Sequence, residues 1–433
     1  MLRLLRLIEI SKGATVMAVE FISRSGARAG EPNAYEVVWP EGRILLDCGA
    51  GTGEPLYLSK LSRPDLVWIS HAHGDHCGGL LKLKERFPQT GVIATVTTRR
   101  MLGPMLAPGS GGYDQGRVGA LVRQIEGIEE GRFTSVGGLP GVRVMALPGG
   151  HVPGAAMLLM EIEVGAGAGE KKRLLYTGDF CTHDQATVEG AGAPVLKEGT
   201  RVDVVVMEAM LGTDREADCW EVGEARRGLE QCVEEAPGAV LFGVSSLGEA
   251  QEMAMIASGR RKVMVDEYLK PVIEKGIEAK RESTGQIEFG NRRQLKERLE
   301  VGGVVIAPGD QYQRGTAAAW LAGGLLDEEE ATVVVLNRAR KKTGAGRLVG
   351  TTRGARLKWW DREVELRARV VHHRWINHAP RWQLVGFAKL LQARKILLVH
   401  GSTGARWAVK RAMEEAGVES EIVVVTNQEP IRW

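Results

Sequence analysis

The chain has few cysteines and no closely spaced pair of them. It contains 433 residues and five cysteines, an odd number without a Cys-x-x-Cys pair. This count disfavours a disulfide framework and predicts a reducing, cytoplasmic compartment. Cys48, Cys77 and Cys181 each follow closely on an acidic residue or a histidine. They are interpreted either as small packing residues or as thiols that make a nearby metal site sensitive to oxidation.

Long hydrophobic runs are missing as well. No apolar run reaches the roughly 18 residues that a membrane span requires, so no membrane association is expected. The opening "MLRLLRLIEISKG" has a short, interrupted apolar run and no small-residue cleavage site, which argues against a signal peptide. Residues 1–16 are predicted to be a weakly folded extension or a mis-assigned start, and a strand-like run begins at Met17.

The chain also lacks an excess of charge of one sign. Its net charge is +3, with 44% hydrophobic and 26% charged residues, which is typical of a globular protein with an ample core. The length favours two domains, or one domain with a large insertion. Strand-like and helix-like segments alternate throughout, most regularly between residues 221 and 336. That β-α-β rhythm predicts a parallel sheet with its own helices.

Histidine is scarce but concentrated. Of nine histidines, three lie in "SHAHGDHCGG", where His71, His73 and His76 surround Asp75. A strand at 66–70 delivers the chain to a tight loop, and alternation predicts His71 and His73 on one side and Asp75 and His76 on another. One loop can therefore bind two metal ions. Imidazole and carboxylate without thiolate suit Zn²⁺, with Mn²⁺ or iron as alternatives.

Further polar residues end predicted strands elsewhere in the chain. The carboxyl ends of strands in layered α/β folds meet at one edge, so these side chains are expected to lie together. The residues are Asp47, His151, Asp179, Glu208 and His400. The predicted assembly has His71, His73 and His151 on one ion, Asp75, His76 and His400 on the other, and Asp179 between them. Asp47 is predicted to be a supporting carboxylate that orients a ligand.

These motifs resemble the metallo-β-lactamase fold, with Asp47, the segment His71 to His76, His151 and Asp179 as its four successive motifs. The resemblance implies a four-layer αββα sandwich, an α/β fold. That superfamily hydrolyses several classes of substrate, so the fold alone does not identify one.

Residues beyond Asp179 narrow the resemblance. Glu208, His378 in "INHAP" and His400 are similar to the three later motifs of the β-CASP nucleases, and the likeness covers residues 17–433. It implies a metallo-β-lactamase domain at 1–209 and 366–433, split by a β-CASP domain at 210–365. A histidine at the position of His400 favours RNA over DNA within that family.

The resemblance implies a zinc-dependent ribonuclease. A hydroxide activated by two ions would cleave single-stranded RNA, leaving a 5′-phosphate and a 3′-hydroxyl. Asp75, Glu208 and His378 are the predicted catalytic residues, with His378 as a general acid oriented by Glu208. Helix capping or packing is the alternative role for His378. The rival functions are hydrolysis of DNA or another phosphodiester, and a non-catalytic RNA-processing subunit. Endonuclease against 5′-exonuclease action and a homodimer are left open.

The substrate cleft departs from the family pattern at Ala209–Gly212, at "APGDQYQRG" (307–315) and at Ile376–Asn377. Between Arg338 and Lys358 there are eight Lys or Arg residues, Arg347 among them, and no acid. This run predicts a surface that follows RNA phosphates, and a solvated basic face is the alternative.

Ser245 and Ser246, in the turn "SSLGEA", are predicted to hold a phosphate on backbone N–H groups or simply to cap a helix. Trp359, Trp360, Trp375 and Trp382 are interpreted as packing residues in preference to base-stacking ones.

Overall fold

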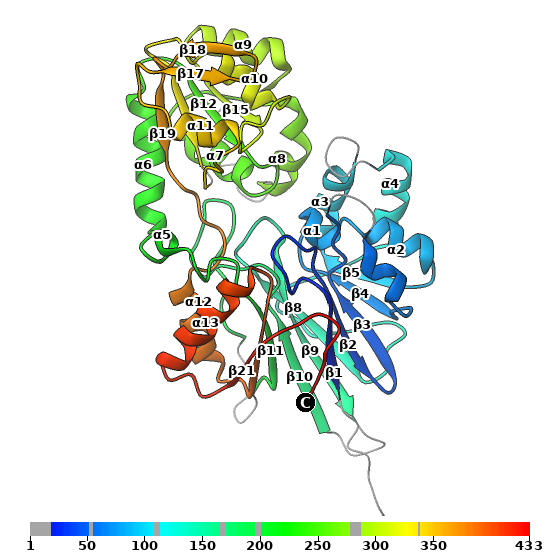
Figure 1. Cartoon of the computed structure of the whole chain (residues 1–433). Helices are drawn as coiled ribbons and strands as arrows, with labels where there is room; N and C mark the ends of the chain where they lie inside the picture. Colours follow the sequence, from blue (N-terminus) through cyan, green and yellow to red (C-terminus); the bar gives the residue numbers. More distant parts are fainter. Residues whose placement is uncertain are drawn as a thin grey trace, which may run out of the picture.

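The computed structural model describes residues 19–51, 55–107, 113–164, 170–194, 201–277, 287–336 and 338–433. The predicted extension at 1–16 lies outside these residues. Figure 1 shows two lobes, one built on two seven-stranded sheets and the other on a six-stranded sheet. None of the described helices is both long enough and apolar enough to cross a membrane.

The two seven-stranded sheets pack face to face. The first has, in spatial order, β22 (Pro430–Arg432), β1 (Glu20–Ser25), β2 (Ala34–Trp39), β3 (Gly42–Leu46), β4 (Leu66–Ile69), β5 (Gly91–Thr95) and β6 (Glu126–Ile128). The second has β21 (Glu421–Val424), β20 (Lys395–Val399), β11 (Val204–Glu208), β10 (Glu170–Tyr176), β9 (Ala156–Val164), β8 (Val142–Pro148) and β7 (Thr134–Ser135). Between them lies a core to which Phe21 and Trp68 contribute from one sheet and Leu158 and Tyr176 from the other.

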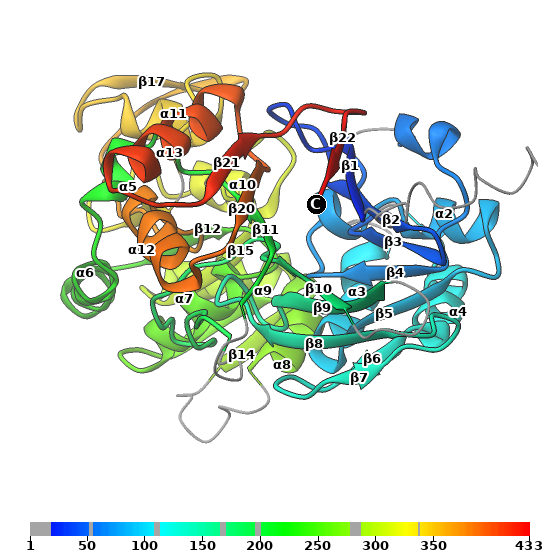
Figure 2. The same ribbon diagram turned by 90° about the horizontal axis from the view of Figure 1, so that it is seen from below.

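Helices cover the outer face of each sheet. On the first sheet lie η1 (Leu56–Lys60), α1 (Gly74–Cys77), α2 (Leu80–Arg86), α3 (Val96–Leu106) and α4 (Gln115–Gln124). The second sheet is covered by α12 (Arg381–Leu391) and α13 (Thr403–Glu415), whose Leu384 and Val409 pack against Leu398 of β20. Figure 2 shows α12 and α13 on one side of the paired sheets and α2 and α4 on the other. The predicted four-layer αββα sandwich is confirmed.

The other lobe is the predicted parallel sheet with its own helices. Its strands run in the order β14 (Ile287–Gly290), β13 (Val263–Asp266), β15 (Val304–Pro308), β12 (Val240–Val244), β16 (Thr332–Val335) and β19 (Arg369–His372), all parallel. One face packs on α6 (Val222–Glu235), α7 (Glu249–Ser258) and α8 (Lys270–Gly276). The other packs on α9 (Arg292–Glu300), α10 (Ala317–Gly323), α11 (Gly344–Val349) and the hairpin of β17 (Arg356–Trp359) and β18 (Arg362–Glu365). Short apolar runs between turns form these strands, and the neighbouring strands β12 and β16 are buried throughout.

The chain crosses between the lobes twice. It leaves the second sheet after β11, passes through α5 (Arg215–Asp218), and returns after β19. Because β19 pairs with β16, the inserted sheet extends to residue 372, beyond the boundary expected at 365. The two crossing segments are joined by Arg374, whose guanidinium donates to both carboxylate oxygens of Asp214 at 2.9 and 2.7 Å. A bidentate pair of this kind fixes the crossing geometrically.

A buried carboxylate joins the lobes at a second place. Glu252 of α7 is only 1% exposed. It accepts hydrogen bonds from the backbone N–H groups of Ala186, at 2.8 Å, and Thr187, at 2.7 Å, in a loop of the sandwich lobe. The Thr187 hydroxyl also donates to it. A buried carboxylate with three donors is stable only while the two lobes stay together, because separation would leave it unpaired or solvated.

Glu252→Gln is therefore expected to lower stability. The amide keeps the size of the side chain but loses the negative charge and presents an N–H group to a backbone donor, so a cost of about 1–3 kcal/mol is expected. Urea unfolding followed by circular dichroism measures it. Glu234→Gln on the exposed side of α6 is the matched control and should change little. Equal midpoints for the two variants would show that the Glu252 contacts do not hold the lobes together.

Candidate metal centre

The predicted site residues meet at one edge of the sandwich, next to the inserted lobe. Asp179, Glu208 and His400 lie at or just after the ends of the parallel strands β10, β11 and β20. Asp47 and His71 lie just after the ends of the parallel strands β3 and β4. His151 follows β8, which has the same direction as β10 because each is antiparallel to β9. The convergence expected from strand ends therefore holds in the structure.

Within this edge the ligand-type side chains form three groups, two of which hold the predicted ligands, while the third consists of Asp179, Glu208 and His378. Of the two groups of predicted ligands, one is His71, His73, His151 and Asp179, and the other is Asp75, His76 and His400; in each, the ligand atoms lie within 4.8 Å of one another. His73 Nδ1 is 3.0 Å from His71 Nε2 and 3.2 Å from His151 Nε2. Tetrahedral zinc with Zn–N bonds of about 2.0–2.1 Å would separate its ligand atoms by roughly 3.3 Å, so the three nitrogens are spaced as one ion requires.

Asp179 lies between the two groups. Its Oδ2 is 3.7 Å from His71 Nε2 and 3.2 Å from His76 Nε2, and its Oδ1 is 3.5 Å from His400 Nε2. Asp179 Oδ1 and His400 Nε2 are both buried without a hydrogen-bond partner. Buried polar atoms are nearly always paired, so two such atoms without a partner that face the same space fit a site for a cation. Imidazoles and carboxylates in two groups fit a pair of divalent metal ions.

The charges of the centre agree with that fit. Burial is the main cause that holds the pKa of His71 and of His151 well below the usual value, which keeps both rings neutral and able to bind a metal. Burial would raise the pKa of Asp179, but the nearby His400 and His76 outweigh it and hold that pKa well below its usual range. This lowered pKa favours the ionised form of the Asp179 carboxylate.

The cysteines near the centre belong to none of the groups of ligand-type side chains found among the described residues. All five cysteines are free. Burial raises the pKa of Cys48 to about 12 and raises those of Cys77 and Cys181 as well. A buried, protonated thiol is a poor nucleophile and a poor metal ligand, which favours the packing interpretation over oxidation-sensitive thiols.

Asp47 makes the contacts expected of a supporting carboxylate. Its Oδ2 accepts from His76 Nδ1 at 2.6 Å, from the Tyr176 hydroxyl at 2.6 Å and from the Ser70 hydroxyl at 2.7 Å. The contact fixes the His76 ring so that Nε2 faces Asp179. Asp47 and His400 have φ values of 59° and 41°, a left-handed backbone conformation that costs energy in residues other than glycine. Such strain is characteristic of positions where a side chain is aimed at a site.

Glu208 and His378 form a pair beside the centre. Glu208 is 1% exposed, and its two oxygens accept the backbone N–H groups of Phe180 at 3.0 Å and Met210 at 3.1 Å. His378 Nδ1 lies 3.0 Å from Oε1 of Glu208, and its Nε2 lies 4.0 Å from Oδ2 of Asp179. Burial would lower the pKa of His378, but Glu208 and then Asp179 outweigh it and raise that pKa to about 9. His378 comes from the segment that returns after β19, not from a strand end beside His400.

Two backbone carbonyls near the centre have no signal in the sequence. His73 donates from Nε2 to the Leu247 carbonyl at 3.2 Å, and His151 donates from Nδ1 to the Asn377 carbonyl at 2.9 Å. Leu247 belongs to the inserted lobe and Asn377 to the returning segment. Each contact turns the opposite ring nitrogen toward the centre, which sets the tautomer that can bind a metal.

Gln185 is a second feature that sequence reasoning missed. Its amide donates to the carbonyls of Gly150 at 2.6 Å and His151 at 2.9 Å, and accepts from Trp375 Nε1 at 2.9 Å. The His151 loop and the segment carrying His378 are thereby joined through one buried side chain. Trp375 is 4% exposed, which agrees with packing rather than base stacking.

The tentative substrate contacts are not assembled as expected. The Ser245 N–H donates to Glu249 Oε2 at 2.7 Å and the Gly248 N–H to Gln251 Oε1 at 2.7 Å, so two donors of the turn are already paired. This favours the helix-cap interpretation of Ser245 and Ser246 over phosphate binding. The Arg347 guanidinium lies 4.8 Å from the Trp360 ring and donates to the Lys358 carbonyl at 2.8 Å, so it is held within its own lobe.

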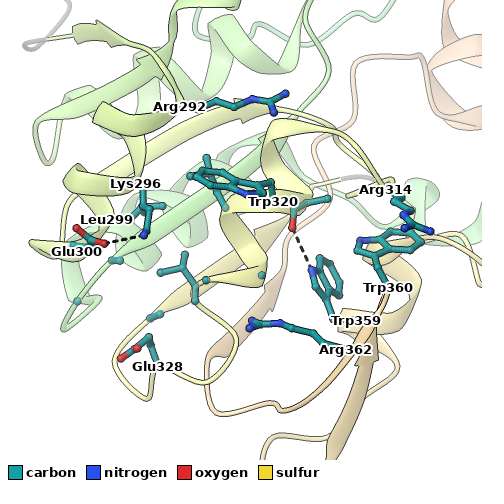
Figure 3. Close-up of a pocket in the computed structure, with 18 of the residues that line it drawn as sticks. Arg292, Lys296, Leu299, Glu300, Arg314, Trp320, Glu328, Trp359, Trp360 and Arg362 are labelled. Atoms are coloured by element: carbon teal, nitrogen blue, oxygen red, sulfur yellow. Dashed lines mark hydrogen bonds and ion pairs between the residues drawn. The ribbon is translucent and has the colours of Figure 1, made fainter.

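A pocket of about 880 Å³ lies away from the centre, between α9, α10 and the β17–β18 hairpin. Figure 3 shows Trp320 in the middle of this distal pocket, with Arg292 and Lys296 on one side and Arg362 on another. Trp320 is 50% exposed, whereas Trp359 is buried and donates to the Ala319 carbonyl. None of the candidate metal ligands lines this pocket.

Comparison with known proteins supports the same fold. Residues 27–180 match the family described as Metallo-beta-lactamase superfamily. The chain is 31% identical to Cleavage and polyadenylation specificity factor 73 of Drosophila melanogaster over 49% of its own length and 32% of that protein. It is 29% identical to an RNase J-like protein of Methanocaldococcus jannaschii over 52% and 51% of the two chains. The chain thus matches about half or less of these curated relatives.

A solved structure extends the likeness over nearly the whole chain. It is a protein of unknown function from Enterococcus faecalis V583, with a TM-score of 0.60 and 13% sequence identity, covering 96% of this chain and 100% of that one. At this identity the likeness shows the fold alone.

His76→Ala is expected to release metal. The substitution removes one of three predicted ligands of the second ion and leaves Asp47 without its imidazole, so the metal content should fall from about two ions per chain toward one. Plasma mass spectrometry of the purified protein measures this. His372→Ala, on the exposed end of β19, is the control. An unchanged metal content in His76→Ala would remove His76 from the ligand set.

Proposed function

We propose that the chain, whose residues 27–180 match the metallo-β-lactamase superfamily, is a zinc-dependent ribonuclease acting on single-stranded RNA. The observation that carries the proposal is the Glu208–His378 pair beside two groups of candidate metal ligands. A hydrolase of this fold that acts on a good leaving group needs only the metal ligands. An imidazole held by a buried carboxylate, as His378 is by Glu208, can in addition supply a proton to a poor leaving group. The printed name of the RNase J-like relative agrees with RNA as the substrate.

The residues assigned to the ions follow the two groups. His71, His73 and His151 would hold one ion, Asp75, His76 and His400 the other, and Asp179 would lie between them. Zinc is proposed because the donors are imidazoles and carboxylates, with Mn²⁺ as the alternative. Two such ions, when bound, supply a hydroxide at neutral pH and offset the negative charge of the reacting phosphate.

The protein's own side chains handle the proton. Glu208 accepts two backbone N–H groups and fixes the His378 ring through Nδ1, so that Nε2 faces the centre. As water attacks phosphorus and the bond to the 3′ oxygen breaks, the proton on His378 Nε2 moves to that oxygen. The products are a 5′-phosphate and a 3′-hydroxyl. Asp75, whose side chain is 45% exposed, is assigned to orient the attacking water at the open side of the centre.

Two other functions are compatible with the fold. One is hydrolysis of DNA or another phosphodiester, and the other is a non-catalytic RNA-processing subunit. The complete set of seven candidate ligands disfavours the second, because a non-catalytic subunit has no need to keep them. The five free cysteines agree with a reducing, cytoplasmic location, and a homodimer stays a prediction.

A comparison of substrates tests the proposal. One zinc-loaded preparation is incubated with single-stranded RNA, single-stranded DNA and bis-p-nitrophenyl phosphate, and RNA is expected to be cleaved fastest. Preferential cleavage of DNA would overturn the assignment to RNA, and no cleavage of any substrate by protein with two zinc ions would favour the non-catalytic subunit. RNA labelled at each end in turn separates endonuclease from 5′-exonuclease action.

His378→Ala is expected to keep its metal and lose turnover. Loss of a general acid lowers kcat by about 10²–10⁴-fold, while the ligand groups remain complete. Rates on RNA and metal content are measured on the same preparation. His183→Ala is the matched control, because that imidazole is also half-buried but contacts the Ile376 carbonyl rather than Glu208. Loss of metal in His378→Ala would make this residue a ligand instead of an acid.

A further inference from the structure

The structure divides the basic run of residues 338–358 into two parts. In the second part the three arginine side chains are engaged within the lobe. Arg347 lies over Trp360, Arg353 donates to the carbonyls of Glu329 and Arg367, and Arg356 pairs with Glu363 at 3.6 Å. These arginines stabilise the β17–β18 hairpin and its surroundings. They are not free to follow a nucleic acid.

The first part is different. Arg338, Arg340, Lys341 and Lys342, here called the basic loop, follow β16 and are exposed. Among the described residues, none of their side chains has an ion pair or a hydrogen bond. Four unpaired cations within five positions repel one another, and a surface that only needs solubility would intersperse acids among them. An anionic partner would remove that repulsion.

The backbone of the basic loop is held in place from below. Gln311 is 2% exposed, and its side-chain oxygen accepts the Arg340 N–H at 3.2 Å and the Thr343 hydroxyl at 3.2 Å. Its amide donates to the Arg338 carbonyl at 3.4 Å. The loop therefore presents its cations from a fixed backbone, which lowers the ordering cost when a partner binds.

The basic loop lies at the edge of the inserted sheet that faces the metal centre. β16 is parallel to its neighbour β12, so both carboxyl ends lie at the same edge. The chain that leaves β12 reaches the centre within three residues, where the Leu247 carbonyl accepts from His73. On the other side, Arg338 is close enough to Asp214 of the crossing segment to help lower the pKa of that carboxyl. The basic loop thus flanks the space between the lobes.

We infer that the basic loop binds the backbone phosphates of an RNA strand on its way to the metal centre. The inference rests on the proposed function, and it adds which surface of the inserted lobe holds the strand beyond the cleaved bond. Guanidinium groups bind phosphate oxygens in pairs and ammonium groups act as point charges, so the loop suits a flexible strand of varying sequence. Because the contacts are to phosphates, they give affinity without base preference.

The test uses a triple variant, Arg340→Gln/Lys341→Gln/Lys342→Gln, in the zinc-loaded full chain. Arg338 is kept because of its position near Asp214. The matched control is Arg292→Gln/Lys296→Gln/Arg362→Gln, which removes the same charge from the distal pocket (Figure 3). For each protein, KM and kcat are measured on a 20-nucleotide RNA and on bis-p-nitrophenyl phosphate. The affinity for fluorescein-labelled RNA is measured in parallel as a function of salt in the His378→Ala background.

For the triple variant KM on RNA is expected to rise roughly tenfold, and the slope of log affinity against log salt should fall by about 2, since each lost contact to a single strand removes about 0.7. Metal content and kcat on bis-p-nitrophenyl phosphate should not change. Unaltered RNA affinity and salt slope would overturn the inference and point to another acidic partner, as would an equal loss in the control. If wild type binds RNA through the loop but cleaves no substrate, the proposed function fails while the inference stands.

Discussion

The geometry of the candidate metal centre depends on one buried carboxylate, that of Asp179. Asp179 lies between two groups of imidazoles, 4% exposed, and one of its oxygens has no hydrogen-bond partner. Burying an ionised carboxylate in that position costs free energy unless cations surround it. The imidazole rings around it have different roles. His71 and His151 are kept neutral by burial, while His76 is tied to Asp47. Asp47 and His400 both have a left-handed backbone conformation, the first where its side chain holds the His76 ring and the second where its Nε2 faces Asp179.

The inserted lobe completes this centre rather than only covering it. The Leu247 carbonyl orients His73, and the segment that returns from β19 supplies His378 and the Asn377 carbonyl that orients His151. Without these two carbonyls, the sandwich lobe alone would not orient the rings of His73 and His151 with the metal-binding nitrogen toward the centre. The pairing of Glu252 with the Ala186–Thr187 loop and of Arg374 with Asp214 keeps the lobes at the separation these contacts need. Fold stability and the geometry of the centre are thus maintained by the same interactions.

Much of this could be predicted from the sequence, for a physical reason. Strand periodicity and polar residues at strand ends are local signals, and parallel strands bring their ends together without further information, so Asp47, Asp179 and His400 could be placed. The contacts from the Leu247 and Asn377 carbonyls could not, because every residue has a carbonyl. Nor could the sequence separate Arg340 from Arg353, since both belong to one basic run and only tertiary contacts engage the second. The edge strand β19 could likewise not be predicted, because only one of its four residues, Val371, is buried and no apolar run marks it.

One departure from the β-CASP pattern, the segment 307–315, has a structural role in the inserted lobe. The divergent segment 307–315 contains Gln311, which holds the basic loop, and Tyr312, which is fully buried. The Tyr312 hydroxyl accepts from the Gly243 N–H at 2.9 Å and donates to the Val334 carbonyl at 2.6 Å, which joins β12 to β16 just below that loop. A change in one segment therefore requires the other to change with it. The segment 307–315 therefore supports the basic loop from within the inserted lobe, while the candidate ligands and the Glu208–His378 pair lie outside that segment.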